Sequence, residues 1–337
     1  MLVNMPVMAL LLIAMGGLAI LLASGHFMIH GAVEMARHLG VSPLMIGMTV
    51  VAFGTSAPEL VVSIQALWKE APDIVLGNVV GSNIANILLI VGVAATIKML
   101  VVPGGAKLRK DCIYLLVFTA IFVVLCWFGE IPGLLGALMV FGLVSYIIWS
   151  FRRSRKDEQL SAANSEPVQE LGEKSLSLGK AVLYTAFGIG GIVLGAYVLL
   201  EGSVQLAREF GVSDVVIGLT IIAIGTSLPE LAASVMAAIR GHPGLAIGNV
   251  MGSNLFNMFG ITGISAAISE MSLVGSLQVP EQMKHFDLWV MFGATVLICM
   301  IFLRGWRIVR LGGVAMLALY LLYIAVLFSK TSFAFPG

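Results

Sequence analysis

Two stretches of the chain are near copies of each other: IGMTVVAFGTSAPELVVS at 46–63 matches IGLTIIAIGTSLPELAAS at 217–234, and GNVVGSNIANI at 77–87 matches GNVMGSNLFNM at 248–258. Both pairs have the same offset, since 217 − 46 and 248 − 77 are both 171. Of the 47 positions from Ile46 to Gly92, 22 are identical to their partners, and the alignment needs no gap. The chain therefore contains an internal duplication, which indicates a repeat architecture.

The composition places this duplication in a membrane. Of the 337 residues, 59% are apolar and 11% are charged, and the mean hydropathy is +1.03. A soluble chain has about 25% charged residues, so this one lacks the polar surface to face water on all sides and must have membrane lipid as a partner. The net charge of +1 argues against a nucleic-acid partner. Three distant cysteines form no zinc or redox cluster: Cys112, Cys126 and Cys299.

Hydropathy predicts an all-α polytopic protein, because a bilayer-crossing helix needs about 20 mostly apolar residues. Ten segments qualify: 5–25, 43–68, 74–97, 112–129, 131–151, 180–200, 214–239, 244–268, 288–303 and 310–329. The polar stretch between the fifth and sixth segments predicts a linker at 152–179, between a first repeat at 1–151 and a second at 180–337. Five spans is an odd number, so the second repeat enters the membrane from the opposite side, and the repeats are inverted.

The distribution of basic residues predicts the orientation of these spans. Of the 19 Lys and Arg, 15 lie in alternate connections on the linker side and 4 on the other side. Basic residues are retained on the cytoplasmic side. We therefore expect a plasma-membrane (inner-membrane) protein with a cytoplasmic linker and both termini outside.

Two acidic residues are the only ionisable side chains that fall well inside the predicted spans, Glu59 and Glu230, and they are repeat partners. A carboxylate at the membrane centre costs at least about 2.5 kcal/mol, so a matched pair predicts a bound cation or proton. Inverted repeats place such a shared site near the bilayer midplane. The alternative, a buried Glu that merely joins helices by hydrogen bonds, is less favoured for a symmetric pair.

A proline precedes each Glu and should unwind the helix, since proline has no amide hydrogen and clashes with the carbonyl four residues back. The carbonyls freed there would line a cavity, at Ala52 to Thr55 and Ala223 to Thr226. Hydroxyl groups accompany them, on Thr55, Ser56, Thr226 and Ser227.

The following span of each repeat is unusually polar but uncharged. Ser82 and Asn86 are four residues apart, as are Ser253 and Asn257, so each pair shares a helix face. We interpret these four residues as further cation ligands. Carboxylate, amide, hydroxyl and carbonyl oxygens suit hard cations, and Ca²⁺ takes 6 to 8 of them. A formal charge of −2 balances one Ca²⁺ or two Na⁺. No cofactor is implied.

With these residues in place, GTSAPE with GNVVGSNIAN and GTSLPE with GNVMGSNLFN closely resemble the two alpha repeats of the cation/calcium exchanger superfamily, and within it the prokaryotic Na⁺/Ca²⁺ exchangers. The resemblance implies antiport of Na⁺ for Ca²⁺ by alternating access in a single chain, with the first and sixth spans sliding past the core. It also implies ion ligands at Thr55, Ser56, Glu59, Ser82 and Asn86, and at Thr226, Ser227, Glu230, Ser253 and Asn257.

Three alternatives stay open. Proton-coupled Ca²⁺ exchangers of the superfamily carry a different motif, GNxxE, so proton coupling is less favoured for this chain. Members that depend on K⁺ carry Asp where this chain has Asn257, so the sequence favours K⁺ independence. A cation channel usually builds its filter at a symmetric pore of several subunits, unlike two halves of one chain. The chain has no G-x-S-x-G or H-E-x-x-H motif, so an enzyme is not predicted.

Overall fold

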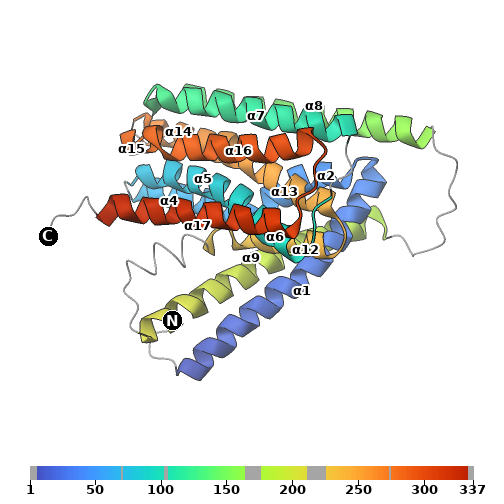
Figure 1. Cartoon of the computed structure of the whole chain (residues 1–337), viewed down its shortest axis with the longest axis horizontal. Helices are drawn as coiled ribbons and strands as arrows, with labels where there is room; N and C mark the ends of the chain where they lie inside the picture. The colour runs from blue at the N-terminus through green and yellow to red at the C-terminus, as the bar shows by residue number, and fades with distance from the viewer. Residues whose placement is uncertain are drawn as a thin grey trace. The chain divides into compact units, whose positions relative to one another are not determined.

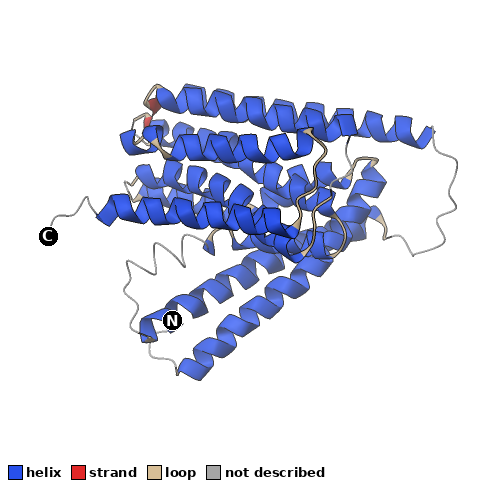
Figure 2. Cartoon of the chain, in the orientation of Figure 1, coloured by secondary structure: helices blue, strands red, loops and turns tan. Residues whose placement is uncertain are grey.

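The computed structural model describes residues 6–69, 71–101, 105–163, 176–210, 225–272 and 275–332, and these are almost entirely helical (Figure 2). They form two compact units, Met1–Pro58 with Tyr146–Gly252, and Glu59–Ser145 with Ser253–Gly337. Each unit takes segments from both sequence repeats. The two compact units therefore do not coincide with the two sequence repeats, and the division into two repeats and a linker stays a prediction.

The elements of the first unit come from two stretches of the chain, one at the N-terminus and one in the middle. They are α1 (Val7–Leu39), α2 (Pro43–Ile46), the π-helix η1 (Gly47–Val51), α3 (Ala52–Thr55), the second half of α8 (Gly133–Ala163), α9 (Leu178–Glu209), α12 (Leu228–Ile239) and most of α13 (Pro243–Leu255).

The second unit contains the remaining elements. They are most of α4 (Ala57–Trp68), α5 (Asp73–Ala85), the π-helix η2 (Asn86–Ile90), α6 (Val91–Ile97), α7 (Gly105–Trp127), β1 (Glu130–Ile131), the first half of α8, the π-helix η4 (Phe256–Ile261), α14 (Thr262–Met271), β2 (Leu277–Gln278), α15 (Glu281–His285), α16 (Asp287–Leu303) and α17 (Arg310–Ser332).

Long apolar helices dominate both units. Within the described residues, seven helices are long and apolar enough to cross a membrane, and a bent pair, Pro43–Thr55 with Ala57–Trp68, makes up to eight. The two parts of that pair meet at 41°. These helices confirm a helical protein with multiple membrane spans, and the count of ten remains a prediction.

In the first unit α1 packs along α9 (Figure 1). Glycines make this close contact possible: a Cβ on Gly195 would lie 2.6 Å from the amide nitrogen of Leu21, and one on Gly31 would lie 2.5 Å from that of Thr185. Small residues let membrane helices approach in this way. The glycines at 188–191, two of which face α1, therefore serve helix packing.

A second close crossing in this unit positions the polar residues described below. A Cβ on Gly47 would lie 2.5 Å from the carbonyl oxygen of Leu245, and one on Gly248 would clash with the carbonyl oxygen of Leu44. The segment α2–η1 therefore runs directly against α13. This contact brings the chain that leads into the first GTS motif beside the helix that carries Asn249.

In the second unit α7 packs on α16 and α6 packs on α17. The Phe118 and Phe259 rings meet edge to face with centroids 4.8 Å apart, a favourable aromatic geometry. A short antiparallel pair joins β1 to β2, with Glu130 opposite Gln278 and Ile131 opposite Leu277.

Several helices are longer than hydropathy predicts. The hydropathy pattern predicts a first span that ends near residue 25, but α1 runs to Leu39 and ends at Gly40, which has a left-handed φ of 63°. Its last turns still bury apolar side chains such as Met35 and Ala36, so packing extends the helix beyond the apolar segment that hydropathy predicts. The predicted linker also begins as a helix, because α8 continues to Ala163 through residues with good helix propensity.

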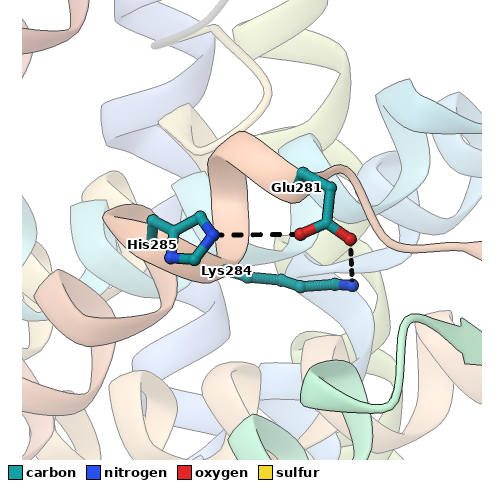
Figure 3. Close-up of polar contacts among 3 residues, drawn as sticks. All are labelled: Glu281, Lys284 and His285. Atoms are coloured by element: carbon teal, nitrogen blue, oxygen red, sulfur yellow. Dashed lines mark hydrogen bonds and ion pairs between the residues drawn. The ribbon is translucent and has the colours of Figure 1, made fainter.

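The turn before α16 carries a small group of charged side chains on α15. Lys284 Nζ lies 2.6 Å from Glu281 Oε1, and His285 Nε2 lies 3.9 Å from Glu281 Oε2 (Figure 3). These are one-turn contacts along one short helix, and Glu281 and His285 are exposed. Such surface pairs contribute little to stability, and this group has no part in the candidate site.

Candidate cation-binding site

The first unit contains Glu230, in the first turn of α12. Its side chain is fully buried. Ser56, in the turn between α3 and α4, donates a hydrogen bond of 2.7 Å from Oγ to Glu230 Oε1. A hydroxyl bonded to a carboxylate keeps an oxygen lone pair, so this pair can offer a cation two oxygens at once.

Asn249 on α13 holds the chain around Glu230. Its Nδ2 donates to the main-chain carbonyl of Glu230 at 3.4 Å and to Ser234 Oγ at 3.0 Å. Its Oδ1 accepts a bond of 3.3 Å from Thr55 Oγ1. One amide therefore connects the first GTS motif to the helix that bears Glu230.

The second unit repeats this frame around Glu59, which is also buried. Asn78 Nδ2 donates to the main-chain carbonyl of Glu59 and to Ser63 Oγ, both at 3.2 Å. Asn78 and Ser63 are the repeat partners of Asn249 and Ser234. Each repeat thus fixes its Glu by the same two hydrogen bonds.

The proposed amide ligands lie where the polar helices become π-helical. Asn86 is the first residue of η2, and Asn257 is the second residue of η4. Isolated π segments often mark functional sites. Ser82 and Ser253, one turn before them, are also buried. All four belong to the second unit, with Glu59.

Several polar atoms in the second unit are buried without a hydrogen-bond partner among the residues that the structure describes. They include Asn86 Oδ1, Ser253 Oγ, and both Oδ1 and Nδ2 of Asn257, together with Asn83 Oδ1 and Ser265 Oγ. A buried polar atom without a partner costs about 1–3 kcal/mol. The oxygens among these atoms therefore fit a cation as the missing partner.

The helix break lies close to the predicted position. The sequence predicts free carbonyls from Ala52 onward, but the Ala52 carbonyl still accepts a bond of 3.0 Å from the Ser56 amide, and the chain turns at Ser56. Pro58 has no amide hydrogen to donate to the Gly54 carbonyl, so the ladder of hydrogen bonds is interrupted after Ala52 and not at it. Thr226 and Ser227 occupy the equivalent turn before α12. Ala223 lies outside the described residues.

Because the helices are longer than predicted, they include further buried acids. Glu34 pairs with Arg37 at 3.1 Å, and Asp287 accepts a bond of 3.0 Å from Tyr323. Glu34 and Asp287 lie outside the spans 5–25 and 288–303 that hydropathy predicts, so they do not contradict the prediction that Glu59 and Glu230 are the ionisable residues within the ten spans. Glu34 and Asp287 have no acidic repeat partner, since the residue 171 positions after Glu34 is Gln205 and the one 171 positions before Asp287 is Leu116.

The sequence interpretation missed the asparagines that hold the ligands. The sequence assigns no individual role to Asn78, Asn83, Asn249 or Asn254. Asn83 and Asn254 donate to each other's main-chain carbonyls, both at 3.4 Å. Their exact repeat relationship was the available signal, because a structural pair must be duplicated together with the site that it supports.

In the described parts of the chain, no three His, Cys, Asp or Glu side chains gather to hold a metal. The donors available near Glu59 and Glu230 are hydroxyl, amide and carbonyl oxygens. That set lacks the soft atoms that transition metals favour and suits Ca²⁺ and Na⁺.

Comparison with known proteins agrees with this donor set. The family model described as "Sodium/calcium exchanger protein" matches residues 8–152 and 180–329. The chain is 34% identical to "Sodium/calcium exchanger MaX1" of Methanosarcina acetivorans, over 94% of this chain and 98% of that protein. It is 33% identical to "Putative antiporter CaxA" of Alkalimonas amylolytica, over 93% of this chain and 97% of the relative.

Solved structures give the same result. The sodium-calcium exchanger NCX_Mj, soaked with zero Na⁺ and Ca²⁺, superposes with a TM-score of 0.80 at 30% identity, over 96% of this chain and all of that one. These relatives are named as exchangers and antiporters, and none of them as an enzyme. The resemblance predicted from the two repeat motifs is confirmed: the chain is a multi-pass membrane protein that belongs to the sodium/calcium exchanger family.

Proposed function

We propose that this protein is a secondary active antiporter that exchanges Na⁺ for Ca²⁺ by alternating access and keeps cytosolic Ca²⁺ low. The observation that carries the proposal is the repeat-matched pair of buried carboxylates, Glu59 and Glu230, each held by an asparagine through its main-chain carbonyl. Burying a charge costs several kcal/mol unless an opposite charge compensates it. A transported cation supplies that compensation.

The proposed ligands are the carboxylates and the neutral oxygens around them. Ser56 supports this assignment because its hydroxyl already contacts Glu230. Asn86, Ser253 and Asn257 support it because each has a buried oxygen that finds no hydrogen-bond partner among the described residues. The full proposed set is Ala52, Thr55, Ser56, Glu59, Ser82, Asn86, Ala223, Thr226, Ser227, Glu230, Ser253 and Asn257.

The charge of this set favours competition between Na⁺ and Ca²⁺. Two carboxylates neutralise one Ca²⁺ or two Na⁺, so either load brings the ligands near neutrality. Asn257 adds no charge. We therefore propose that transport does not require K⁺ as a third ion.

The topology proposed is ten membrane-spanning helices in two inverted repeats, with both termini outside and the linker cytoplasmic, in the plasma membrane. The count of 15 basic residues on the linker side against 4 on the other supports this orientation. A single chain suffices, because both halves of an inverted repeat lie in one polypeptide.

For the moving part we propose α1 and α9. They contact each other along their length through glycines, so they are expected to move together. Many of their remaining faces are apolar and exposed, which suits helices that slide against lipid.

Energetics favour three Na⁺ per Ca²⁺ for export. With about 100 mV, inside negative, and a tenfold Na⁺ gradient, each entering Na⁺ releases roughly 3.7 kcal/mol. Expelling Ca²⁺ costs roughly 4.6 kcal/mol electrically plus about 1.4 per tenfold gradient. Two Na⁺ thus support a Ca²⁺ gradient of roughly 10², and three support well over 10⁴.

The deciding experiment is ⁴⁵Ca²⁺ uptake into proteoliposomes loaded with Na⁺, choline, or choline at acid pH. Exchange predicts uptake only with internal Na⁺, whereas a channel would pass Ca²⁺ with every internal solution. Uptake driven by internal acid without Na⁺ would instead identify a proton-coupled exchanger. Adding K⁺ to both sides tests K⁺ dependence, and empty liposomes provide the blank.

A further inference from the structure

Of four repeat-matched asparagines in the second unit, three form a hydrogen-bonded group, so the arrangement is only partly symmetric. Asn83 and Asn254 are repeat partners, and each donates through Nδ2 to the other's main-chain carbonyl at 3.4 Å. Both side chains are buried. This reciprocal pair ties α5 to the end of α13.

The main-chain carbonyls determine which way the two side chains face. A carbonyl oxygen can only accept a hydrogen bond, so the atom of Asn254 that contacts Asn83 must be its nitrogen. Its other atom, Oδ1, is then an acceptor. The orientation of Asn254 is thus set by the backbone of Asn83 and does not depend on the Asn83 side chain.

This orientation is passed on to a proposed ligand. Asn254 Oδ1 accepts a bond of 3.0 Å from Asn86 Nδ2. Since Asn254 Oδ1 cannot donate, Asn86 must present its nitrogen to it and leave its Oδ1 on the other side. Asn86 Oδ1 is buried and has no hydrogen-bond partner in the described ranges.

The equivalent contact in the second repeat is not formed. By repeat symmetry Asn257 Nδ2 should donate to Asn83 Oδ1, yet neither atom has a hydrogen-bond partner within the described residues. Only one of the two repeat-related amides is therefore held in a fixed orientation.

We propose that Asn254 is a positioning residue that keeps the carbonyl oxygen of Asn86, and not its NH₂ group, available to the transported cation. The inference rests on the proposed function, because it assumes that Asn86 is an ion ligand. An amide turned the wrong way would place two partly positive hydrogens against the cation, so the orientation acts on cation affinity. Asn254 itself contacts no ion in this scheme.

The chain offers a matched control for this role. Replacing Asn254 with Leu removes one bond of the reciprocal pair and also frees Asn86. Replacing Asn83 with Leu removes the equivalent bond of the pair, while the main-chain carbonyl that orients Asn254 remains. Each variant loses one bond of the reciprocal pair, and Asn83→Leu also loses the contact of Asn83 Nδ2 with Met291 Sδ at 3.6 Å. The two variants differ in whether Asn86 stays oriented.

The experiment measures Ca²⁺-dependent thermal stabilisation of the purified full-length protein, together with the KM and kcat of Na⁺-driven ⁴⁵Ca²⁺ uptake. We expect Asn254→Leu to weaken Ca²⁺ binding about fivefold, the effect of one net hydrogen bond, and to raise KM by a similar factor with little change in kcat. Asn83→Leu should change affinity less than twofold. Without Ca²⁺ the two variants should melt at similar temperatures.

A second substitution keeps the test usable if Asn254→Leu folds poorly. Asn254→Asp, protonated on the oxygen that faces the Asn83 main-chain carbonyl, keeps both the donor to that carbonyl and an acceptor for Asn86 Nδ2, so it should bind Ca²⁺ about as tightly as the wild type. Equal weakening by Asn254→Leu and Asn83→Leu, or weakening by Asn254→Asp, would overturn the positioning role. A wild-type protein that neither binds nor exchanges Ca²⁺ would instead refute the proposed function, so the two failures are distinguishable.

Discussion

The hydrogen bond from Ser56 to Glu230 allows a quantitative test of the site. Both side chains are buried, and the bond of 2.7 Å joins a hydroxyl to a carboxylate. Ser56→Ala removes this hydrogen bond, which connects the turn after α3 directly to the Glu230 side chain. The substitution changes little volume, so packing should be preserved.

The expected magnitude follows from the class of bond. A hydrogen bond to a charged group contributes about 1.5–3 kcal/mol. In the proposed site it stabilises the ionised carboxylate that attracts the cation, and the same hydroxyl oxygen is a ligand. If this energy is lost from Ca²⁺ binding, affinity falls about 10- to 150-fold at 1.4 kcal/mol per factor of ten.

The assay is initial ⁴⁵Ca²⁺ uptake into Na⁺-loaded proteoliposomes over a wide range of external Ca²⁺. The KM for Ca²⁺ should rise by that factor in Ser56→Ala, whereas Ser56→Thr, which keeps the hydroxyl, should stay within a few-fold of the wild type. A wild-type KM in Ser56→Ala, at matched protein incorporation, would refute the role of this contact in binding.

Three further predictions concern charge, selectivity and motion. Glu59→Gln and Glu230→Gln should each abolish Na⁺-driven Ca²⁺ uptake while the protein still purifies as a monodisperse species, because each removes half of the site charge but little volume; full uptake in both would contradict the site. Asn257→Asp should make Ca²⁺ uptake depend more steeply on pH or K⁺ than in the wild type, because a third carboxylate in the proposed site needs a proton or another cation; superimposable pH and K⁺ series would reduce Asn257 to a packing role. The double variant Gly25→Cys/Met236→Cys places two Cβ atoms 3.3 Å apart and should form a disulfide between α1 and α12, the helix that carries Glu230. This disulfide should stop Ca²⁺ uptake until it is reduced, and undiminished uptake by the oxidised protein would argue against movement of α1.

The repeats and the helix break were readable from the sequence because their causes are local. Pro58 and Pro229 cannot continue a preceding helix, because proline has no amide hydrogen for the carbonyl four residues back, and the apolar runs require membrane helices. The position of the break was less readable. Whether the Ser56 amide still reaches the Ala52 carbonyl depends on how far the last turn persists, and that turn is packed against other elements.

Other features depend on contacts that a single sequence does not reveal. The π segments that begin beside Asn86 and Asn257 have no distinctive residue pattern. The interhelical bonds of Asn83 and Asn254 could not be inferred from spacing along one helix, because they run between segments 171 residues apart. The helical continuation of α8 past Arg152 was missed because charge was interpreted as a sign of a linker, although Arg, Lys, Glu and Gln are good helix formers.

The placement of Glu59 and Glu230 in the first turns of α4 and α12 affects whether the proposed exchanger can return across the membrane without a bound ion. The start of a helix carries a partial positive charge, which favours a nearby carboxylate by about 0.3–1 kcal/mol, and up to about 2 in buried positions. In the proposed exchanger, an unloaded protein would have to carry uncompensated charge through a low-dielectric interior to reset, and this raises the barrier to an empty return. The two helix starts thus supply a physical reason for obligatory counter-transport, in which the protein resets only after it has loaded the other ion.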